Sequence, residues 1–206
     1  MEFYLRATEI IDWKSPVVLD CARALSADAS SRIEIAKSCY EWVRDHISHS
    51  GDHKATVTTC RASHVISEGT GWCFAKSHLL AALLRANDIP SGLCYQRLAR
   101  DDGNGFTLHG LNAVLLPKFG WFRIDARGNK PGVNAQFCPP KEKLAFSPQS
   151  DEEFDFPEIW PDPAQLVLDC LSRCREWEQV VANLPDIPMA KRPQNLSLNR
   201  SGGSLP

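Results

Sequence analysis

The chain has 206 residues, of which 43% are hydrophobic and 23% charged, and its formal net charge is −2. This composition is typical of a globular protein, and the near-neutral charge argues against nucleic acid or an anionic membrane as a partner. No apolar run approaches the roughly 20 residues that would span a bilayer.

The length and the cysteine pattern predict one cytosolic domain without disulfides. We expect a single domain over residues 1–187 and a disordered tail over residues 188–206. The first thirteen residues carry four charged side chains and do not resemble a secretion signal. The eight cysteines include no Cys-x-x-Cys pair, so we expect reduced, mostly buried thiols.

The first half of the chain is predicted to be helical. A helix over residues 15–25 begins with a serine N-cap followed by proline. A second helix, over residues 30–47, carries apolar side chains at spacings of three and four. Residues 48–71 predict mostly loop, with one short helical turn at 61–67.

The middle of the chain changes from a helical to an extended pattern. The third helix, expected over residues 73–87, is apolar on nearly all sides and should therefore be central and buried. Strands are predicted over 91–99, 108–116 and 120–126, with a weaker one over 134–138. Because helices come first and strands follow, the predicted fold class is α+β, with N-terminal helices packed on an antiparallel sheet.

The last third of the chain predicts a loop and one more helix. Residues 147–163 are acidic and rich in proline, so we expect an ordered or semi-ordered surface loop. The length and aromatic content of residues 149–160 suggest a lid over the active-site cleft. A single C-terminal helix is predicted over residues 162–184. Cys170 and Cys174 lie one turn apart on it and are expected to face the core.

Cys73 stands at the start of the third helix, directly after the sequence GTGW. A thiol attacks as thiolate, and the N–H groups and dipole of a helix N-terminus favour a negative charge there. Gly69 and Gly71 permit a tight approach of the chain to this helix. A lone cysteine is more often a buried core residue, so a reactive role for Cys73 requires a partner.

His109 and Asp125 are the partners that the sequence offers. A thiolate needs an imidazole as base and acid, and the imidazole needs a carboxylate or amide to orient it. His109 lies in one predicted strand and Asp125 ends the next, sixteen residues later. The two side chains can meet only on the same face of the hairpin, which requires an odd-numbered turn or a bulge near Gly120.

Three segments resemble the transglutaminase-like superfamily. They are GTGWCFAKSHLLAALLRANDIPSGLCYQRL, LHGLNAVLLPKFGWFRIDARGN and, upstream, YEWVRDHISHSGD. The resemblance covers residues 31–130 and implies a papain-like cysteine-proteinase fold, also called the transglutaminase core. It also implies that Cys73 is the nucleophile, His109 the base and Asp125 the group that orients the base.

Two positions depart from the pattern of that family and leave the substrate open. Leu111 stands where an aromatic residue is frequent, and Ala126-Arg127 stands where Pro-Thr is frequent. Members of the family cross-link glutamine to amines, hydrolyse peptide or amide bonds, or have lost activity.

The predicted chemistry is acyl transfer through a thioester, with a protein, peptide or small amide as substrate and an amine or water as acceptor. The backbone N–H of Cys73 would stabilise the oxyanion, and the indole N–H groups of Trp72 and Trp42 are further donor candidates. The sequence predicts no cofactor and no metal, and it does not indicate an oligomeric state.

Two other functions stay open at this point. One is a zinc-binding module built from side chains of ligand type that lie close together in the sequence, although without the Cys-x-x-Cys spacing of structural zinc sites: His46, His49, His53, Cys60 and His64. The other is a non-catalytic interaction protein that keeps the fold, with the acidic residues 151–158 available to a basic partner.

Overall fold

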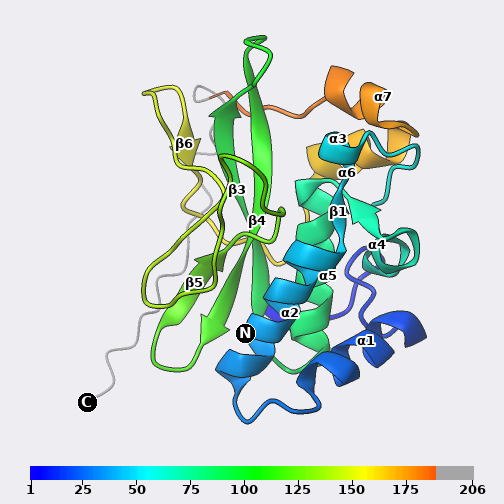
Figure 1. The fold of residues 1–206 in the computed structure, drawn as a ribbon, viewed down its shortest axis with the longest axis vertical. Coiled ribbons are helices and arrows are strands. Elements are labelled where there is room, and N and C mark those ends of the chain that lie inside the picture. The colour runs from blue at the N-terminus through cyan, green and yellow to red at the C-terminus, as the bar shows by residue number, and fades with distance from the viewer. Residues whose placement is uncertain (189–206) are drawn as a thin grey trace.

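A computed structural model describes residues 1–188, and the rest of the predicted tail lies outside the described residues. The chain forms a four-stranded antiparallel sheet with the N-terminal helices on one face (Figure 1). The α+β class predicted from the sequence is confirmed. No helix in the described part of the chain is long and apolar enough to cross a membrane.

The helices of the first half lie close to their predicted positions, except for the short α3, which falls in a stretch predicted as loop. A 3-10 turn at Glu2–Tyr4 precedes α1 (Pro16–Ser26), α2 (Arg32–His46), α3 (Ser50–His53), α4 (Ala62–Glu68) and α5 (Cys73–Ala86). The Ser31 hydroxyl accepts the Glu34 backbone N–H at 3.2 Å and thereby caps α2. α4 ends at Gly69, whose φ of +64° is a left-handed conformation that glycine adopts without strain.

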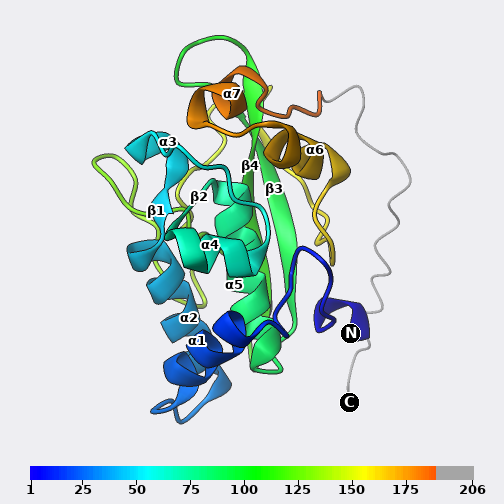
Figure 2. The ribbon, with the colours of Figure 1, turned by 90° about the vertical axis from the view of Figure 1, so that its right-hand side faces the viewer.

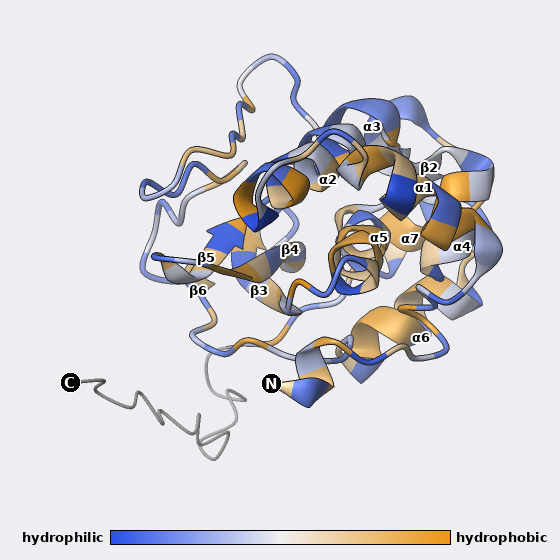
Figure 3. Cartoon of the chain, turned by 90° about the horizontal axis from the view of Figure 1, so that it is seen from below, coloured by the Kyte–Doolittle hydropathy of each residue, from blue (hydrophilic) through white to orange (hydrophobic). Residues whose placement is uncertain are grey.

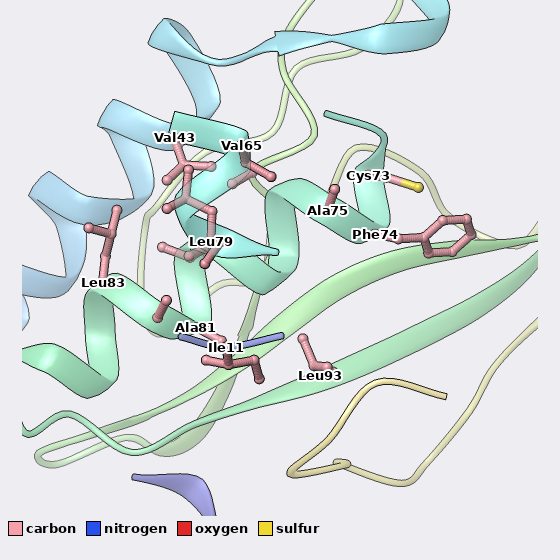
Figure 4. Close-up of a cluster of buried hydrophobic side chains, with 14 of the residues drawn as sticks. Ile11, Val43, Val65, Cys73, Phe74, Ala75, Leu79, Ala81, Leu83 and Leu93 are labelled. Atoms are coloured by element: carbon pink, nitrogen blue, oxygen red, sulfur yellow. The ribbon is translucent and has the colours of Figure 1, made fainter. Parts of the chain in front are cut away.

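Helix α5 runs between the sheet and the other helices, as its apolar pattern predicts (Figure 3). Nearly all of its side chains are buried, including Leu79 and Leu83. Figure 4 shows these two leucines beside Val43 of α2 and Val65 of α4. Because α5 is packed on all sides, the position of its first residue, Cys73, is fixed by the core.

The sheet has the order β5–β4–β3–β6. Its strands are β3 (Ser91–Ala99), β4 (Phe106–Leu116), β5 (Gly120–Ile124) and β6 (Phe154–Asp155). A separate parallel pair, β1 (Ser48–His49) and β2 (Thr70–Gly71), leads directly into the start of α5. The three main predicted strands are thus confirmed.

The weaker strand predicted over 134–138 is wrong. Gln136 makes an isolated bridge to Lys143 instead of joining the sheet. The backbone groups of Ala135 are taken by side chains, because Asn129 accepts its N–H at 2.7 Å and Arg44 donates to its carbonyl at 3.2 Å. These bonds remove the donor and acceptor that a strand ladder would need.

The connection between β5 and α6 covers the outer face of the sheet. Leu144 and Ile159 pack against the small cluster of Cys94, Leu111 and Ala113 on that face. The segment predicted as a surface loop over 147–163 contains β6, which extends the sheet beyond β3. The segment therefore supplies an edge strand of the sheet as well as loop.

The single C-terminal helix predicted over 162–184 is two helices, α6 (Gln165–Arg173) and α7 (Trp177–Ala182). Cys174 has an extended ψ of 137° and ends α6, and the backbone N–H of Trp177 donates to the Ala55 carbonyl at 3.3 Å. This tertiary bond turns α7 across one end of the sheet, near α3 (Figure 2). Cys170 and Cys174 are buried, and all eight cysteines are unpaired.

Arg85 of α5 is 1% exposed and donates to the backbone carbonyls of Ser91, Arg6 and Pro161 at 2.8, 2.9 and 2.6 Å. Arg85→Met leaves these carbonyls without a donor, so we expect a loss of about 3 kcal/mol in the free energy of unfolding measured in urea. The exposed Arg23→Met, as a control, should cost less than about 0.5 kcal/mol. Equal losses for the two variants would contradict the role of Arg85.

Candidate active site

The β4–β5 hairpin has the odd-numbered turn that a contact between His109 and Asp125 requires. Its turn holds the three residues 117–119, and Asn112 pairs with Ile124. This odd-numbered turn places His109 and Asp125 on the same face, and His109 Nε2 lies 2.8 Å from Asp125 Oδ2. The structure therefore brings these two predicted residues together.

Asp125 is completely buried, yet its carboxylate has three hydrogen-bond donors. Besides His109, the backbone N–H of Ala145 donates at 3.0 Å and that of Arg127 at 3.1 Å. Burial favours the neutral acid, but the charge of His109 and these hydrogen bonds together hold the pKa of Asp125 below its usual value. The carboxylate is therefore ionised.

His109 is the positively charged partner of this pair. Burial works to lower the pKa of its ring, but Asp125, and after it Cys73, outweigh burial and raise the pKa to about 10. Phe146 packs edge-on against the ring, with centroids 5.0 Å apart at 88°. Since Asp125 occupies Nε2, the Nδ1 atom is left for a reaction partner.

Cys73 begins α5 and is 8% exposed. No side chain caps this helix, so the N–H groups of its first turn have no side-chain acceptor. The backbone N–H of Gly110, the residue after His109, donates to Cys73 Sγ at 3.5 Å. In Figure 4 the sulfur points away from Val65 and Leu79.

Gly110 permits the close approach of β4 to the start of α5. A Cβ atom at this position would lie 2.7 Å from Phe74 Cδ1 and 3.2 Å from Phe74 Cα. Gly110 was not among the predicted site residues, although a glycine inside a predicted strand is a known signal of close backbone contact.

A cavity of about 590 Å³ contains both Cys73 and His109. Trp72 also lines it, and the indole N–H of this residue is buried without a hydrogen-bond partner. Trp42, the other indole considered from the sequence, lies on α2 and stacks on His46 outside this lining. The apolar part of the lining comes from Leu98, Leu108, Phe146, Val181 and Leu184.

A charged cluster forms a wall of the cavity next to His49, whose ring contacts Trp72, the residue before Cys73. Strand pairing of β1 with β2 sets His49 next to Gly71. Asp52 accepts two hydrogen bonds from Arg127, at 2.6 and 2.9 Å, and one from Lys130 at 2.8 Å. Burial opposes ionisation of Asp52, but these two cations hold its pKa below the usual value. In the sequence Arg127 stands out only as a departure from the family pattern, and its place in this wall could not be predicted from it.

His49 adds an uncharged imidazole to this wall. Burial, and then the charge of Arg127, lower the pKa of His49 well below its usual value, although Asp52 lies 3.6 Å from its Nδ1. The ring contacts Trp72 edge-on, with centroids 5.4 Å apart. His49 is therefore neutral near neutral pH.

Lys76, one turn after Cys73, joins α5 to the end of α2. Its ammonium donates to the backbone carbonyls of Arg44, at 3.3 Å, and Ile47. Burial, followed by the charge of Arg127, lowers the pKa of Lys76 to about 7. This contact fixes the first turn of α5 from the side opposite the sheet.

The side chains considered for a zinc site are dispersed. His46 stacks on Trp42, His49 lines the cavity, and His64 lies 3.6 Å from Glu68 on α4. Within residues 1–188, no group of three or more His, Cys, Asp or Glu side chains is arranged to hold a metal ion.

A comparison of the sequence with models of known protein families shows to which family the chain belongs. The model of the transglutaminase-like superfamily matches residues 20–126, which is more than half of the chain. The chain belongs to the transglutaminase-like superfamily. The family resemblance predicted from the sequence motifs is thereby confirmed. No curated protein sequence matches the chain.

Solved structures resemble this chain at low sequence identity. A protein of Cytophaga hutchinsonii described as a "putative cysteine protease" is 18% identical, with a TM-score of 0.50 over 60% of this chain and 40% of its own. The periplasmic domain of TgpA from Pseudomonas aeruginosa is 14% identical, with a TM-score of 0.44 over 60% of this chain and 45% of that one. This chain therefore spans less than half the length of these relatives.

Gly110→Ala should separate β4 from α5. The added methyl group meets Phe74, so we expect a loss of about 2 kcal/mol in urea unfolding and at least a roughly ten-fold slower alkylation of Cys73. Gly103→Ala is the control for a loss of stability without a steric clash. Its φ of +73° makes alanine strained there, but the added methyl group meets open space, so the alkylation rate of Cys73 should stay unchanged. Equal alkylation rates for all three proteins would disprove the close contact.

The His109–Asp125 pair predicts a pH-dependent stability. The pKa of His109 rises from about 6.5 in the unfolded chain to about 10 in the folded one, so its stabilisation is complete below about pH 6.5 and disappears as the pH approaches about 10. His109→Gln should lower the free energy of unfolding most near pH 6, and the difference from the wild type should shrink steadily toward pH 10. A difference that is constant over this range would contradict the charged pair.

Proposed function

We propose that this protein is a thiol acyltransferase or amidase that acts on amide bonds through a thioester on Cys73. The observation that carries the proposal is the buried His109–Asp125 ion pair, which shares a cavity with a cysteine at a helix N-terminus. In this arrangement the imidazolium is the counter-ion that a reactive thiolate requires.

In the first step the Cys73 sulfur attacks the amide carbonyl carbon, and a C–S bond forms. The carbonyl oxygen becomes an oxyanion, which the backbone N–H of Cys73 stabilises. We assign the second donor to the indole N–H of Trp72, because Trp72 lines this cavity and its indole N–H has no hydrogen-bond partner. The C–N bond then breaks, and the Nδ1 proton of His109 passes to the departing amine.

In the second step His109 removes a proton from the acceptor, which is water or an amine. The acceptor attacks the thioester carbonyl, the C–S bond breaks, and Cys73 leaves as the thiolate. Asp125 stabilises the imidazolium throughout and fixes its orientation. Water as acceptor gives hydrolysis, and an amine gives a new amide.

The substrate we propose is a protein, a peptide or a small amide that enters the cavity from solvent. The apolar side chains of Leu108 and Leu184 would contact its hydrocarbon part. A cytosolic location remains part of the proposal, because eight unpaired thiols suit a reducing compartment.

The test is the rate of alkylation by iodoacetamide near neutral pH, resolved for each cysteine by peptide mass spectrometry. Cys73 should react at least about 100-fold faster than the exposed Cys138, which serves as internal reference. His109→Ala and Asp125→Asn should each remove most of this difference. Labelling of Cys73 no faster than of Cys138 would overturn the proposal and favour a non-catalytic interaction protein.

A second measurement addresses turnover. Cys73→Ala should abolish both amide hydrolysis and amine incorporation, while its far-ultraviolet circular dichroism matches the wild type. Activity that persists in Cys73→Ala would exclude the thioester route.

A further inference from the structure

The wall of the cavity formed by Asp52, Arg127 and Lys130 has more positive than negative charge. Both cations bind the same carboxylate, and within residues 1–188 neither has a second acidic partner. Arg127 is held rigidly, because both of its terminal nitrogens bond to Asp52. The Lys130 side chain is 37% exposed, so its ammonium can contact a ligand while it stays paired with Asp52.

The nearby Asp125 does not cancel this surplus charge. Its carboxylate is completely buried and is already satisfied by His109 and by two backbone N–H groups. Lys76 lies behind the same wall, where it is enclosed by backbone carbonyls and cannot reach the cavity. Among the cations of this wall in residues 1–188, Lys130 is therefore the one that a ligand in the cavity can reach.

A second part of the lining, here called the acidic rim, comes from the β3–β4 turn and from the segment directly before β6, and it has the reverse charge. Asp101, Asp102 and Glu153 form it together with a single cation, Arg100, which pairs with Asp102 at 2.7 Å. The two groups of charges come from different segments, so an anionic group is attracted to Lys130 and repelled from the acidic rim.

We propose that the acyl donor carries a carboxylate, and that Lys130, with Arg127 behind it, binds this group beside Cys73. The inference rests on the proposed function, because it assigns the substrate class to the same cysteine. A suitable donor is an amide with an acidic side chain or a free carboxylate next to the scissile bond. The acidic rim repels the carboxylate of such a donor, and this repulsion disfavours binding of the donor in the reverse orientation.

Iodoacetate and iodoacetamide test this proposal, because they differ in a carboxylate. With each reagent the sulfur of Cys73 attacks the CH₂ carbon, a C–S bond forms, and the C–I bond breaks to release iodide. The quantity measured is the iodoacetate-to-iodoacetamide ratio of rate constants at Cys73, divided by the same ratio at Cys138. We expect this relative ratio to exceed about three in the wild type and to fall with added salt.

Lys130→Gln should lower the relative ratio about two- to three-fold, and Lys130→Glu should lower it further. Lys118→Gln makes the same charge change at the β4–β5 turn, beyond the opposite end of β4, and should leave the ratio as in the wild type. A wild-type ratio near one, or equal ratios in the wild type and Lys130→Gln, would overturn the carboxylate site. Slow labelling of Cys73 by both reagents would instead overturn the proposed function, so the two failures are distinguishable.

Discussion

The ionised carboxylate of Asp125, buried without access to solvent, is the constraint on which the rest of the site depends. A buried charge is costly unless it is paired and hydrogen-bonded, and here three different segments meet that requirement. Strand β4 supplies His109, the turn after β5 supplies one backbone N–H, and the connection near Phe146 supplies another. The hairpin register, the path of the connection and the charge on the imidazole therefore all satisfy the same carboxylate.

The second requirement is that the sulfur stay fixed against this pair. Helix α5 is enclosed by the sheet and by α1, α2 and α4, so its first residue moves little. Gly110 then lets β4 approach closely enough for its backbone N–H to reach Cys73 Sγ. The packing of the hydrophobic core around α5 thus fixes the position of one thiol in the lining of the cavity.

Much of this arrangement could be predicted from the sequence. The helix start at Cys73, the two strands and the need for an odd-numbered turn follow from local patterns, and the family resemblance named the same three residues. The break between α6 and α7 could not be predicted, because it depends on a bond between Trp177 and Ala55, far apart in the chain. The Asp52–Arg127 contact joins residues 75 positions apart and is equally invisible to local patterns. The failed strand at 134–138 has the same cause, since side chains distant in sequence take its backbone groups.

The proposed chemistry requires His109 to be an imidazolium in the resting protein. Nitrogen NMR of the labelled ring, followed from about pH 5 to about pH 10, measures this protonation state directly. Both ring nitrogens should stay protonated well above neutral pH in the wild type, and Asp125→Asn should shift the titration of His109 downward. A neutral His109 ring at pH 7 in the wild type would rule out the imidazolium and with it the ion pair on which the chemistry rests.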